Sequence, residues 1–319
     1  MKYKNTLLYG MLLLLAGTFE ACDNNGIDDL DFSISLDNPQ ETFKVGEPVT
    51  FNLYGDPDYL LFYSGEYGKK YANRNRTMAD VEALSLTYNL ELKYAAKRFR
   101  NGTRVLISED FNGIYDEENI NKATWSDMNG QLQVPVIESD NEGYQHGTIS
   151  NVQVDLSDYK YKNFYLAIEY NLPALNEEEK GKYVHPDVYF YPKLNQTIDG
   201  KMTQKTSPKA DFGFNFVRIK SNDTSSDNPT VTAVDDSKVS INGRNGKNGT
   251  HVWAISLPID AAKVSADEGL SIKNYSAALP KYSHIYNEPG EYTVTFVARN
   301  ANAWNCTEQV KEIKVTVVE

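Results

Sequence analysis

The sequence predicts an all-β protein made of two β-sandwiches. Apolar and polar residues alternate over Val49–Leu53 and Tyr292–Ala298, a pattern typical of strands that bury one face. Many more short segments alternate in the same way, and almost none shows a helical period. An apolar share of 40%, with 13 Phe and 22 Tyr, is enough for two cores. Together these observations favour antiparallel sandwiches or jelly rolls.

The chain begins with a segment typical of an export signal. A basic start precedes a Leu-rich run at residues 7–16, too short to span a bilayer comfortably, so residues 1–21 are expected to be a cleaved signal peptide. Ala21 before Cys22 matches the end of a bacterial lipobox, although residues 19–20 depart from it. We expect Cys22 to be lipidated, and an ordinary secretory signal cut near Ala21 is the alternative.

Residues 22–31 are expected to be the lipidated cysteine and an acidic leash, because DNNGIDDLD has few apolar residues. Such runs resemble the surface-export signals of lipoproteins in Gram-negative gut anaerobes, which implies an outer-membrane, lipid-anchored location facing the cell surface. The periplasmic face stays open. Cys306 is the only other cysteine, so lipidation of Cys22 leaves no intramolecular disulfide.

The formal net charge of -12 makes nucleic acid a poor partner, because an acidic surface repels phosphates. Neutral sugars, cations and other proteins remain open as partners.

Two segments far apart in the sequence are expected to complete one sandwich. Val45–Arg76 and Tyr286–Val318 each contain too few strands to bury a core alone. Pairing them gives an outer domain of residues 32–76 plus 274–319, which an inserted domain of residues 77–273 interrupts.

The inserted domain is expected to consist of short strands. A helix over residues 79–97 is the alternative for its start, but every second residue from Leu84 to Tyr94 is Leu or Tyr, which predicts a long strand. One or two helical turns are expected within residues 176–182. Further strands are predicted at Arg104–Ser108, within Gln145–Leu156, and at Asn163–Asn171, Asp187–Pro192, Asp211–Ile219 and Val252–Leu257.

Two resemblances follow from these residues. YNEPGEYTVTF at Tyr286–Phe296 is similar to the Y-x-x-P-G-x-Y-x-V strand of polycystic-kidney-disease-type immunoglobulin-like repeats, and FYSGE at Phe62–Glu66 stands where that family has W-x-F-G-D-G. This resemblance implies an immunoglobulin-like (PKD-type) outer domain with a jelly-roll-like insertion.

The mature chain, including FYSGEYG, ATWSD and EPGEYTVTF, also resembles the surface lipoprotein family filed as domain of unknown function DUF5017. Members of that family tend to be encoded beside starch-utilisation-system-like glycan uptake machinery. The resemblance therefore implies carbohydrate capture, with a polysaccharide or oligosaccharide and an outer-membrane glycan transporter complex as partners. The family has no assigned activity.

The sequence offers no clear catalytic set. The four histidines have no zinc-type spacing, and Ser64 lacks the G-x-S-x-G elbow of an acyl-transfer nucleophile, so it reads as part of a tight turn. Among 44 acidic residues no pair stands out as a glycosidase pair. We expect a protein that is not an enzyme, and a hydrolase is the less favoured option.

One loop offers hard oxygen ligands. Asp110, Asn112 and Asp116 lie close together in sequence, and calcium prefers such oxygens, but their spacing is not that of an EF-hand. The alternatives are a structural calcium and a solvated acidic loop; no other cofactor is expected.

Loop aromatics beside amides are the candidates for sugar binding, because sugar rings stack on exposed Trp or Tyr while amides bond the hydroxyls. Trp304 with Asn302 and Asn305 is one candidate, and Tyr115 is another; for Trp304 the alternative is a side chain folded over its own domain. Trp125 and Trp253 are expected in the core. Tyr189 and Tyr191 are expected to form an aromatic ladder that packs between domains, and an exposed ladder is the alternative.

The function that we predict is a non-catalytic outer-membrane lipoprotein that binds polysaccharide for glycan capture and uptake. The alternative is a structural or adhesion lipoprotein that binds another protein through its β-sandwich surface.

Overall fold

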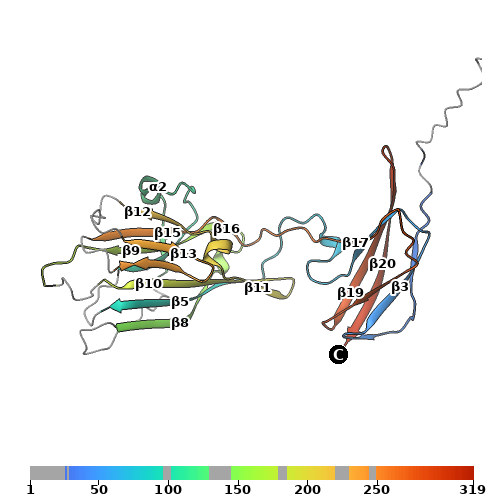
Figure 1. Ribbon diagram of the computed structural model, residues 1–319, viewed down its shortest axis with the longest axis horizontal. Coiled ribbons are helices and arrows are strands. Elements are labelled where there is room, and N and C mark those ends of the chain that lie inside the picture. The colour runs from blue at the N-terminus through green and yellow to red at the C-terminus, as the bar shows by residue number, and fades with distance from the viewer. Residues whose placement is uncertain are drawn as a thin grey trace, which may run out of the picture. The chain divides into compact units, whose positions relative to one another are not determined.

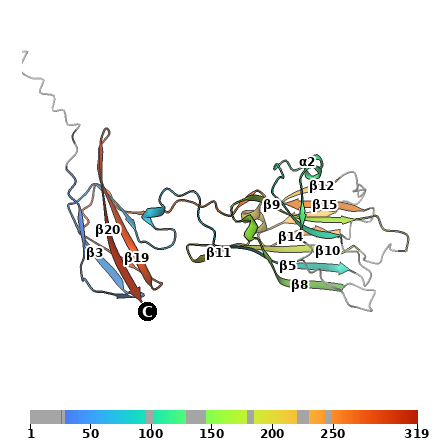
Figure 2. The same cartoon turned by 180° about the vertical axis from the view of Figure 1, so that it is seen from behind.

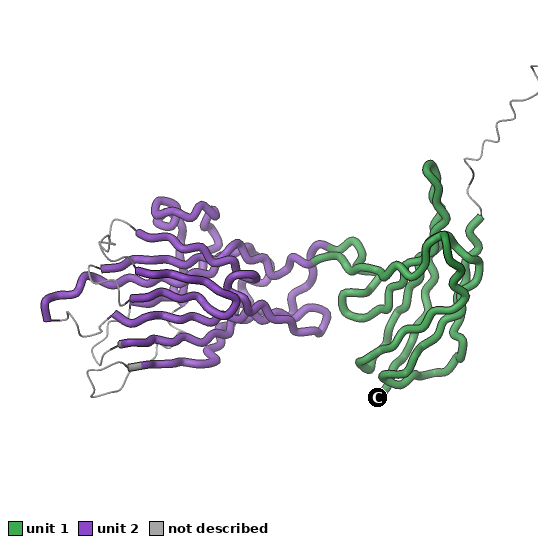
Figure 3. Tube along the Cα trace, viewed as in Figure 1, with its two compact units in different colours: residues 1–76, 265–319 green, residues 77–264 purple. Residues whose placement is uncertain are grey.

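The computed structural model describes residue 26 and residues 29–95, 102–128, 145–178, 185–219, 230–243 and 249–319. The protein is all-β, with sheets packed face to face (Figures 1 and 2). The chain divides into two compact units, unit 1 (residues 1–76 and 265–319) and unit 2 (residues 77–264), as Figure 3 shows. Unit 1 is therefore discontinuous in sequence.

The second boundary falls after Val264, whereas the sequence analysis expected it after residue 273. The difference has a physical reason. Strand β17 (Leu270–Lys273) pairs with β4 (Tyr59–Tyr63) of unit 1, with Phe62 opposite Leu270. This short strand buries little of its surface and has no clear alternation, so its sequence did not reveal its sheet.

Unit 1 is a sandwich of two sheets. One has the order β1-β3-β18, and the other has the order β17-β4-β19-β20-β2, in which β2 runs parallel to β20. This is the strand order of an immunoglobulin-like sandwich, with unit 2 inserted in the connection from β4 to β17. The bounds are β1 Ser33–Leu36, β2 Phe43–Lys44, β3 Pro48–Tyr54, β18 Lys281–Ile285, β19 Gly290–Ala301 and β20 Cys306–Val318.

The core of unit 1 is aromatic. Phe51, Phe62 and Phe296 are buried between the two sheets, with ring centroids 5.2 to 6.2 Å apart. At the start of β19 the hydroxyl of Tyr292 donates to the carbonyl of Glu288 at 2.7 Å, which is the tyrosine corner common in immunoglobulin-like domains. The EPGEY sequence therefore forms the turn into a central strand.

Unit 2 is a larger sandwich whose chain repeatedly crosses between sheets, as in a jelly roll. Its first sheet has the order β13-β14-β10-β5-β8, with β11 on β10. Its bounds are β5 Ala83–Ala95, β8 Gln145–Asp155, β10 Asp187–Ile198, β11 Lys201–Lys205, β13 Val231–Val234 and β14 Val239–Asn242.

The second sheet has the order β12-β15-β9-β6-β7, with β16 on β9. Its bounds are β6 Thr103–Ser108, β7 Ser126–Asp127, β9 Asn163–Leu172, β12 Asn215–Arg218, β15 Thr250–Ile255 and β16 Ile259–Asp260. Leu86, Leu90 and Phe190 of the first sheet meet Ile168 and Val252 of the second to form the core.

Unit 2 also contains short helices: α2 Glu117–Lys122, η2 Ser157–Tyr159 and η3 Pro208–Phe212, while η1 Tyr71–Asn73 belongs to unit 1. The strand expected at 211–219 is wrong in its first half, because η3 is a turn of π-helix and Gly213 then adopts a left-handed φ of 59°. Residues 176–178 carry no helix, and the rest of the expected helical turn lies outside the described residues.

Candidate functional site

The outward side of the first sheet of unit 2 carries a row of polar and aromatic side chains. Alternation along β10 turns Val188, Phe190 and Leu194 into the core, so their neighbours in the strand face outward. We call this surface the tyrosine face. It consists of Ser85, Thr87, Asn89, Glu91 and Lys93 of β5 with Tyr189, Tyr191, Lys193, Asn195 and Thr197 of β10.

The strand register aligns the two halves of the tyrosine face. Tyr189 lies opposite Glu91, and Tyr191 lies opposite Asn89. The amide of Asn195 donates to the hydroxyl of Thr87 at 2.7 Å and accepts from the amide of Gln204, on β11, at 2.7 Å. The amides and hydroxyls are therefore held in fixed orientations across three strands.

Two charged groups on the tyrosine face, Glu91 and Lys93, are paired with each other. The hydroxyl of Tyr191 donates to the Glu91 carboxylate at 3.0 Å, and that carboxylate lies 2.9 Å from the Lys93 ammonium. Burial, followed by the bond to Glu91, raises the pKa of Tyr191 to about 12, so its hydroxyl stays protonated at neutral pH. The Lys93 ammonium also lies 4.9 Å from the centre of the Tyr189 ring.

This arrangement can bind hydroxyl groups. Amides and hydroxyls both donate and accept hydrogen bonds, and the flanks of tyrosine rings contact C–H surfaces. The tyrosine face therefore fits recognition of a polyhydroxylated ligand.

The structure places Trp304, Asn302 and Asn305 in unit 1, at the turn between β19 and β20. Trp304 is 74% exposed, so it is not folded over its own domain. The side-chain oxygen of Asn302 accepts from the backbone N–H of Trp304 at 2.9 Å and of Asn305 at 2.8 Å. Asn302 therefore builds the turn that presents the indole.

Tyr115 lies in unit 2 and is half-buried. Its ring packs against Phe111 at 5.6 Å, and its hydroxyl donates to the carbonyl of Ser256 at 2.9 Å. Burial raises the pKa of Tyr115. Its hydroxyl is thus used within the fold, and Tyr115 and Trp304 belong to different units.

The segment around Tyr115 covers the outward side of the second sheet. Phe111 and Ile120 pack there on Leu106 and Ala167, and Trp253 is buried with them, as expected from its sequence. Trp125 is partly buried, with its ring 5.0 Å from that of Trp253.

The same sheet buries a charged group. The side chain of Glu169 is 3% exposed and bonds to the Arg104 guanidinium, and its Oε1 lies 2.7 Å from Nε2 of His251. Burial alone would raise the pKa of the Glu169 carboxyl, but the bond from His251 and the charge of Arg104 lower it overall.

The three side chains whose oxygens were proposed as calcium ligands form hydrogen bonds within the loop itself. Asp110 accepts from the backbone N–H of Thr124 at 2.7 Å, Asn112 accepts from that of Ile114 at 3.0 Å, and Asp116 caps α2. Within the described part of the chain, no group of three or more His, Cys, Asp or Glu is placed to hold a metal ion.

Ser64 lies beside a carboxylate and a histidine, but in the wrong order for a catalytic triad. Its hydroxyl donates to Glu66 at 2.7 Å, and the same oxygen of Glu66 lies 2.8 Å from Nε2 of His284. Because the carboxylate stands between serine and imidazole, His284 cannot take the serine proton directly. Ser64 is also buried, and its carbonyl accepts from the hydroxyl of Tyr286 at 2.9 Å.

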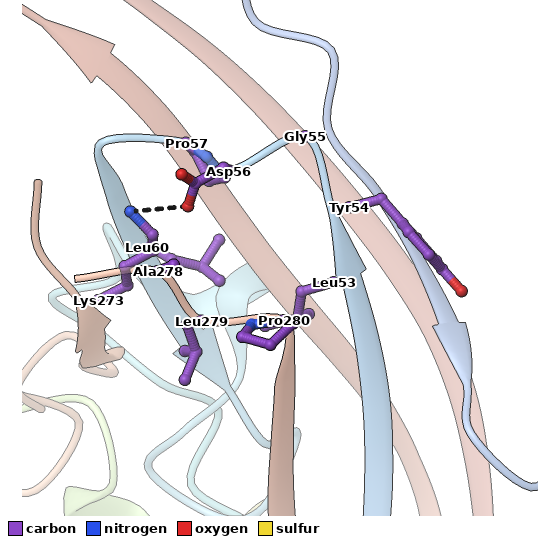
Figure 4. A pocket seen from close by; sticks show the side chains of 10 residues that line it. All are labelled: Leu53, Tyr54, Gly55, Asp56, Pro57, Leu60, Lys273, Ala278, Leu279 and Pro280. Atoms are coloured by element: carbon purple, nitrogen blue, oxygen red, sulfur yellow. Dashed lines mark ion pairs between the residues drawn. The ribbon is translucent and has the colours of Figure 1, made fainter.

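Unit 1 has an open hollow of about 410 Å³ beside the β3–β4 turn (Figure 4). Leu60, Leu279 and Pro280 line it, and Tyr54 points away from the others. The ammonium of the buried Lys273 lies 3.3 Å from the exposed carboxylate of Asp56. The hollow thus holds a single ion pair among apolar walls.

Cys22 and the expected signal peptide lie outside the described residues. Among the residues that are described, no helix is both long and apolar enough to cross a bilayer.

The tyrosine face was not among the candidate sites predicted from the sequence, which favoured packing between domains for Tyr189 and Tyr191 and kept an exposed ladder as the alternative. The signal was present in the alternation of Asp187–Pro192, which the structure extends into a twelve-residue strand. The sequence did not show which strand pairs with β10, since β5 lies about 100 residues earlier.

Comparison with known proteins adds one finding. No curated protein and no solved structure matches this chain. A family model, described as Domain of unknown function (DUF5017), matches residues 21–204, which end at β11, so the match does not extend over the whole mature chain. Because these residues make up more than half of the 319, the chain belongs to the DUF5017 family.

Proposed function

We propose that this protein is a non-catalytic outer-membrane lipoprotein that binds polysaccharide at the cell surface, within a glycan capture and uptake system. The observation that carries the proposal is the tyrosine face, with its aligned amides, hydroxyls and tyrosines. The export-type N-terminus with Cys22 supports an anchored location, and the resemblance to glycan-uptake lipoproteins supports the ligand class.

The dimensions of the face suit an extended chain. From Tyr189 to Thr197 the strand rises about 27 Å, at about 3.4 Å per residue. Side chains on neighbouring strands are spaced about 4.8 Å apart, so hydrogen-bonding groups recur in both directions. A flat face of this length would contact several sugar rings in a row, as an extended glycan requires.

The charge of the protein favours a neutral glycan. On the face Lys93 pairs with Glu91 and Lys193 adds one positive charge, whereas the protein as a whole carries a net charge of -12. A polyanionic glycan would be repelled by that overall field.

Affinity electrophoresis and calorimetry against a panel of plant and host polysaccharides test the proposal. Tyr191→Ala is expected to weaken binding at least fivefold, because truncation of an anchoring tyrosine typically costs more than about 1 kcal/mol. Tyr275→Ala is the control, since Tyr275 is also a surface tyrosine, 75% exposed, but belongs to unit 1. Circular dichroism of both variants checks that they are folded.

Failure of the wild-type protein to be retarded by any neutral polysaccharide would overturn the proposal. An open sheet face is also a surface that another protein can use. If the wild type binds no glycan, and Tyr191→Ala abolishes the binding of a protein partner, the structural or adhesion function would therefore be favoured.

A further inference from the structure

The start of the mature chain runs along the β19–β20 hairpin toward its tip. The side chain of Gln309, on β20, accepts from the backbone N–H of Phe32 at 3.0 Å and donates to the carbonyl of Leu30. At the tip itself, the amide of Asn302 donates to the carbonyl of Gly26 at 3.3 Å. Gly26 therefore lies beside the turn that presents Trp304.

The distance left to the anchor is short. Four residues separate Gly26 from Cys22, and an extended chain spans at most about 3.6 Å per residue, so the gap is at most about 14 Å. A lipid on Cys22 would hold Gly26, and with it Asn302, close to the bilayer surface.

The chemistry of the tip suits that position. Residues 300–307, NANAWNCT, contain no charged side chain, in a chain with 44 acidic residues. Trp304 is largely exposed, and an indole combines an apolar ring with one N–H donor, which is why Trp is enriched at membrane–water interfaces. An uncharged tip can enter the headgroup region without the desolvation cost of an ion.

The tip is also held firmly. The side chain of Asn300 accepts from the backbone N–H of Asp58 at 2.9 Å, and Asn302 closes the turn. The indole is therefore presented by a fixed hairpin end, and little conformational entropy is lost when it binds.

We propose that the β19–β20 tip docks on the lipid bilayer beside the anchor, with Trp304 in the headgroup interface. This inference rests on the lipid anchor of the proposed function. It gives Trp304 a membrane role and leaves glycan binding to the tyrosine face.

Fluorescence quenching tests the inference on the full lipidated chain. The protein is placed in vesicles of phosphatidylethanolamine and phosphatidylglycerol, with or without brominated acyl chains. Brominated lipid is expected to quench the emission of the wild type, and Trp304→Phe is expected to abolish this quenching, because Trp253 is buried and Trp125 is partly buried within the fold of unit 2.

A matched control moves the indole to the other end of the hairpin. Asn287→Trp in the Trp304→Phe background places it before the start of β19, roughly 37 Å from the tip along the strand. That indole is expected to escape quenching.

The outcomes separate the two proposals. If the wild type co-floats with vesicles, Cys22→Ala does not, and Trp304 is still not quenched, the anchor stands and the docking inference fails. If Cys22→Ala floats as well as the wild type, or neither floats, the anchor fails and the inference with it. If a neutral polysaccharide, and not brominated lipid, changes the emission of Trp304, then Trp304 binds glycan and the inference is wrong.

Discussion

Replacing Glu169 by Gln tests how unit 2 tolerates a buried charge. Glu169→Gln keeps the shape of the side chain but removes its charge. The two partners of Glu169 are then solvated to different extents. The Arg104 side chain is 47% exposed, so water can solvate its charge, whereas the His251 side chain is only 10% exposed. Breaking a fully buried ion pair costs about 3–5 kcal/mol, so with one partner solvated we expect a loss of about 2 kcal/mol.

That loss has a measurable size in unit 2. For a domain of 150–250 residues, 1 kcal/mol lowers the melting temperature by about 2–4 °C, so the unit 2 transition should fall by about 4–8 °C. Urea unfolding followed by tryptophan emission gives the free energy directly. Trp125 and Trp253 report on unit 2, and a Trp304→Phe background removes the signal of unit 1.

The loss should also depend on pH. The folded pKa of Glu169 is lowered, so its charge stabilises the fold above the unfolded pKa, near 4.5, and this contribution is lost as pH falls through the folded value. The stability of Glu169→Gln should therefore depend less on pH below about 4.5 than that of the wild type.

A surface ion pair provides the control. Glu109 and Lys162 lie 2.9 Å apart and are both nearly half exposed, so Glu109→Gln should cost less than about 1 kcal/mol. Equal losses for Glu169→Gln and Glu109→Gln would refute the reasoning from burial.

Three smaller predictions concern single contacts. Asp116→Ala should cost unit 2 about 1 kcal/mol in urea unfolding, because its carboxylate caps α2 through Asn119, while Asp116→Asn should cost little; equal losses would contradict the capping role. Tyr292→Phe should cost unit 1 about 1 kcal/mol by removing the bond to Glu288, and calorimetry should show the unit 2 transition unchanged. A chelator should leave the melting temperature unchanged, because Asp110 and Asp116 already accept N–H bonds; a fall would restore the calcium hypothesis.

Strand patterns could be predicted from sequence where one face of a strand is buried. The alternation from Leu84 to Tyr94 matches β5, because each Leu or Tyr before Tyr94 enters the core. Alternation was misleading around Phe212 and Phe214, which are both buried and stacked at 5.7 Å although η3 and Gly213 break the strand between them. The alternation of apolar residues indicates which side chains are buried, not which secondary structure buries them. Here a turn of π-helix followed by Gly213 buries both phenylalanines.

The candidate site was harder to predict, because its residues meet only through long-range pairing. Tyr191 reveals its surroundings only once β10 is known to pair with β5. Trp304 was identified as a loop aromatic from its Asn-rich neighbours, but its closeness to Gly26 depends on a contact across 276 residues.

The insertion couples the stability of the two units. In unit 1, β4 ends at Tyr63 and β17 begins at Leu270, so with unit 2 unfolded the connection is a loop of residues 64–269. With unit 2 folded, its ends are paired, because Val264 donates to the carbonyl of Thr77 at 3.1 Å. The effective loop then shrinks to residues 64–76 and 265–269, about 18 in all.

The change in loop length has a worked consequence. A roughly elevenfold shortening lowers the closure cost by about 2 kcal/mol, since each doubling of length costs about 0.6 kcal/mol. Two bonds also join the two parts of the short loop. The Asp267 carboxylate accepts from the backbone N–H of Lys70 at 2.8 Å and lies 3.1 Å from the Arg76 guanidinium. Folding of unit 2 therefore stabilises unit 1, so damage to the unit that carries the tyrosine face also weakens the unit that carries the β19–β20 tip.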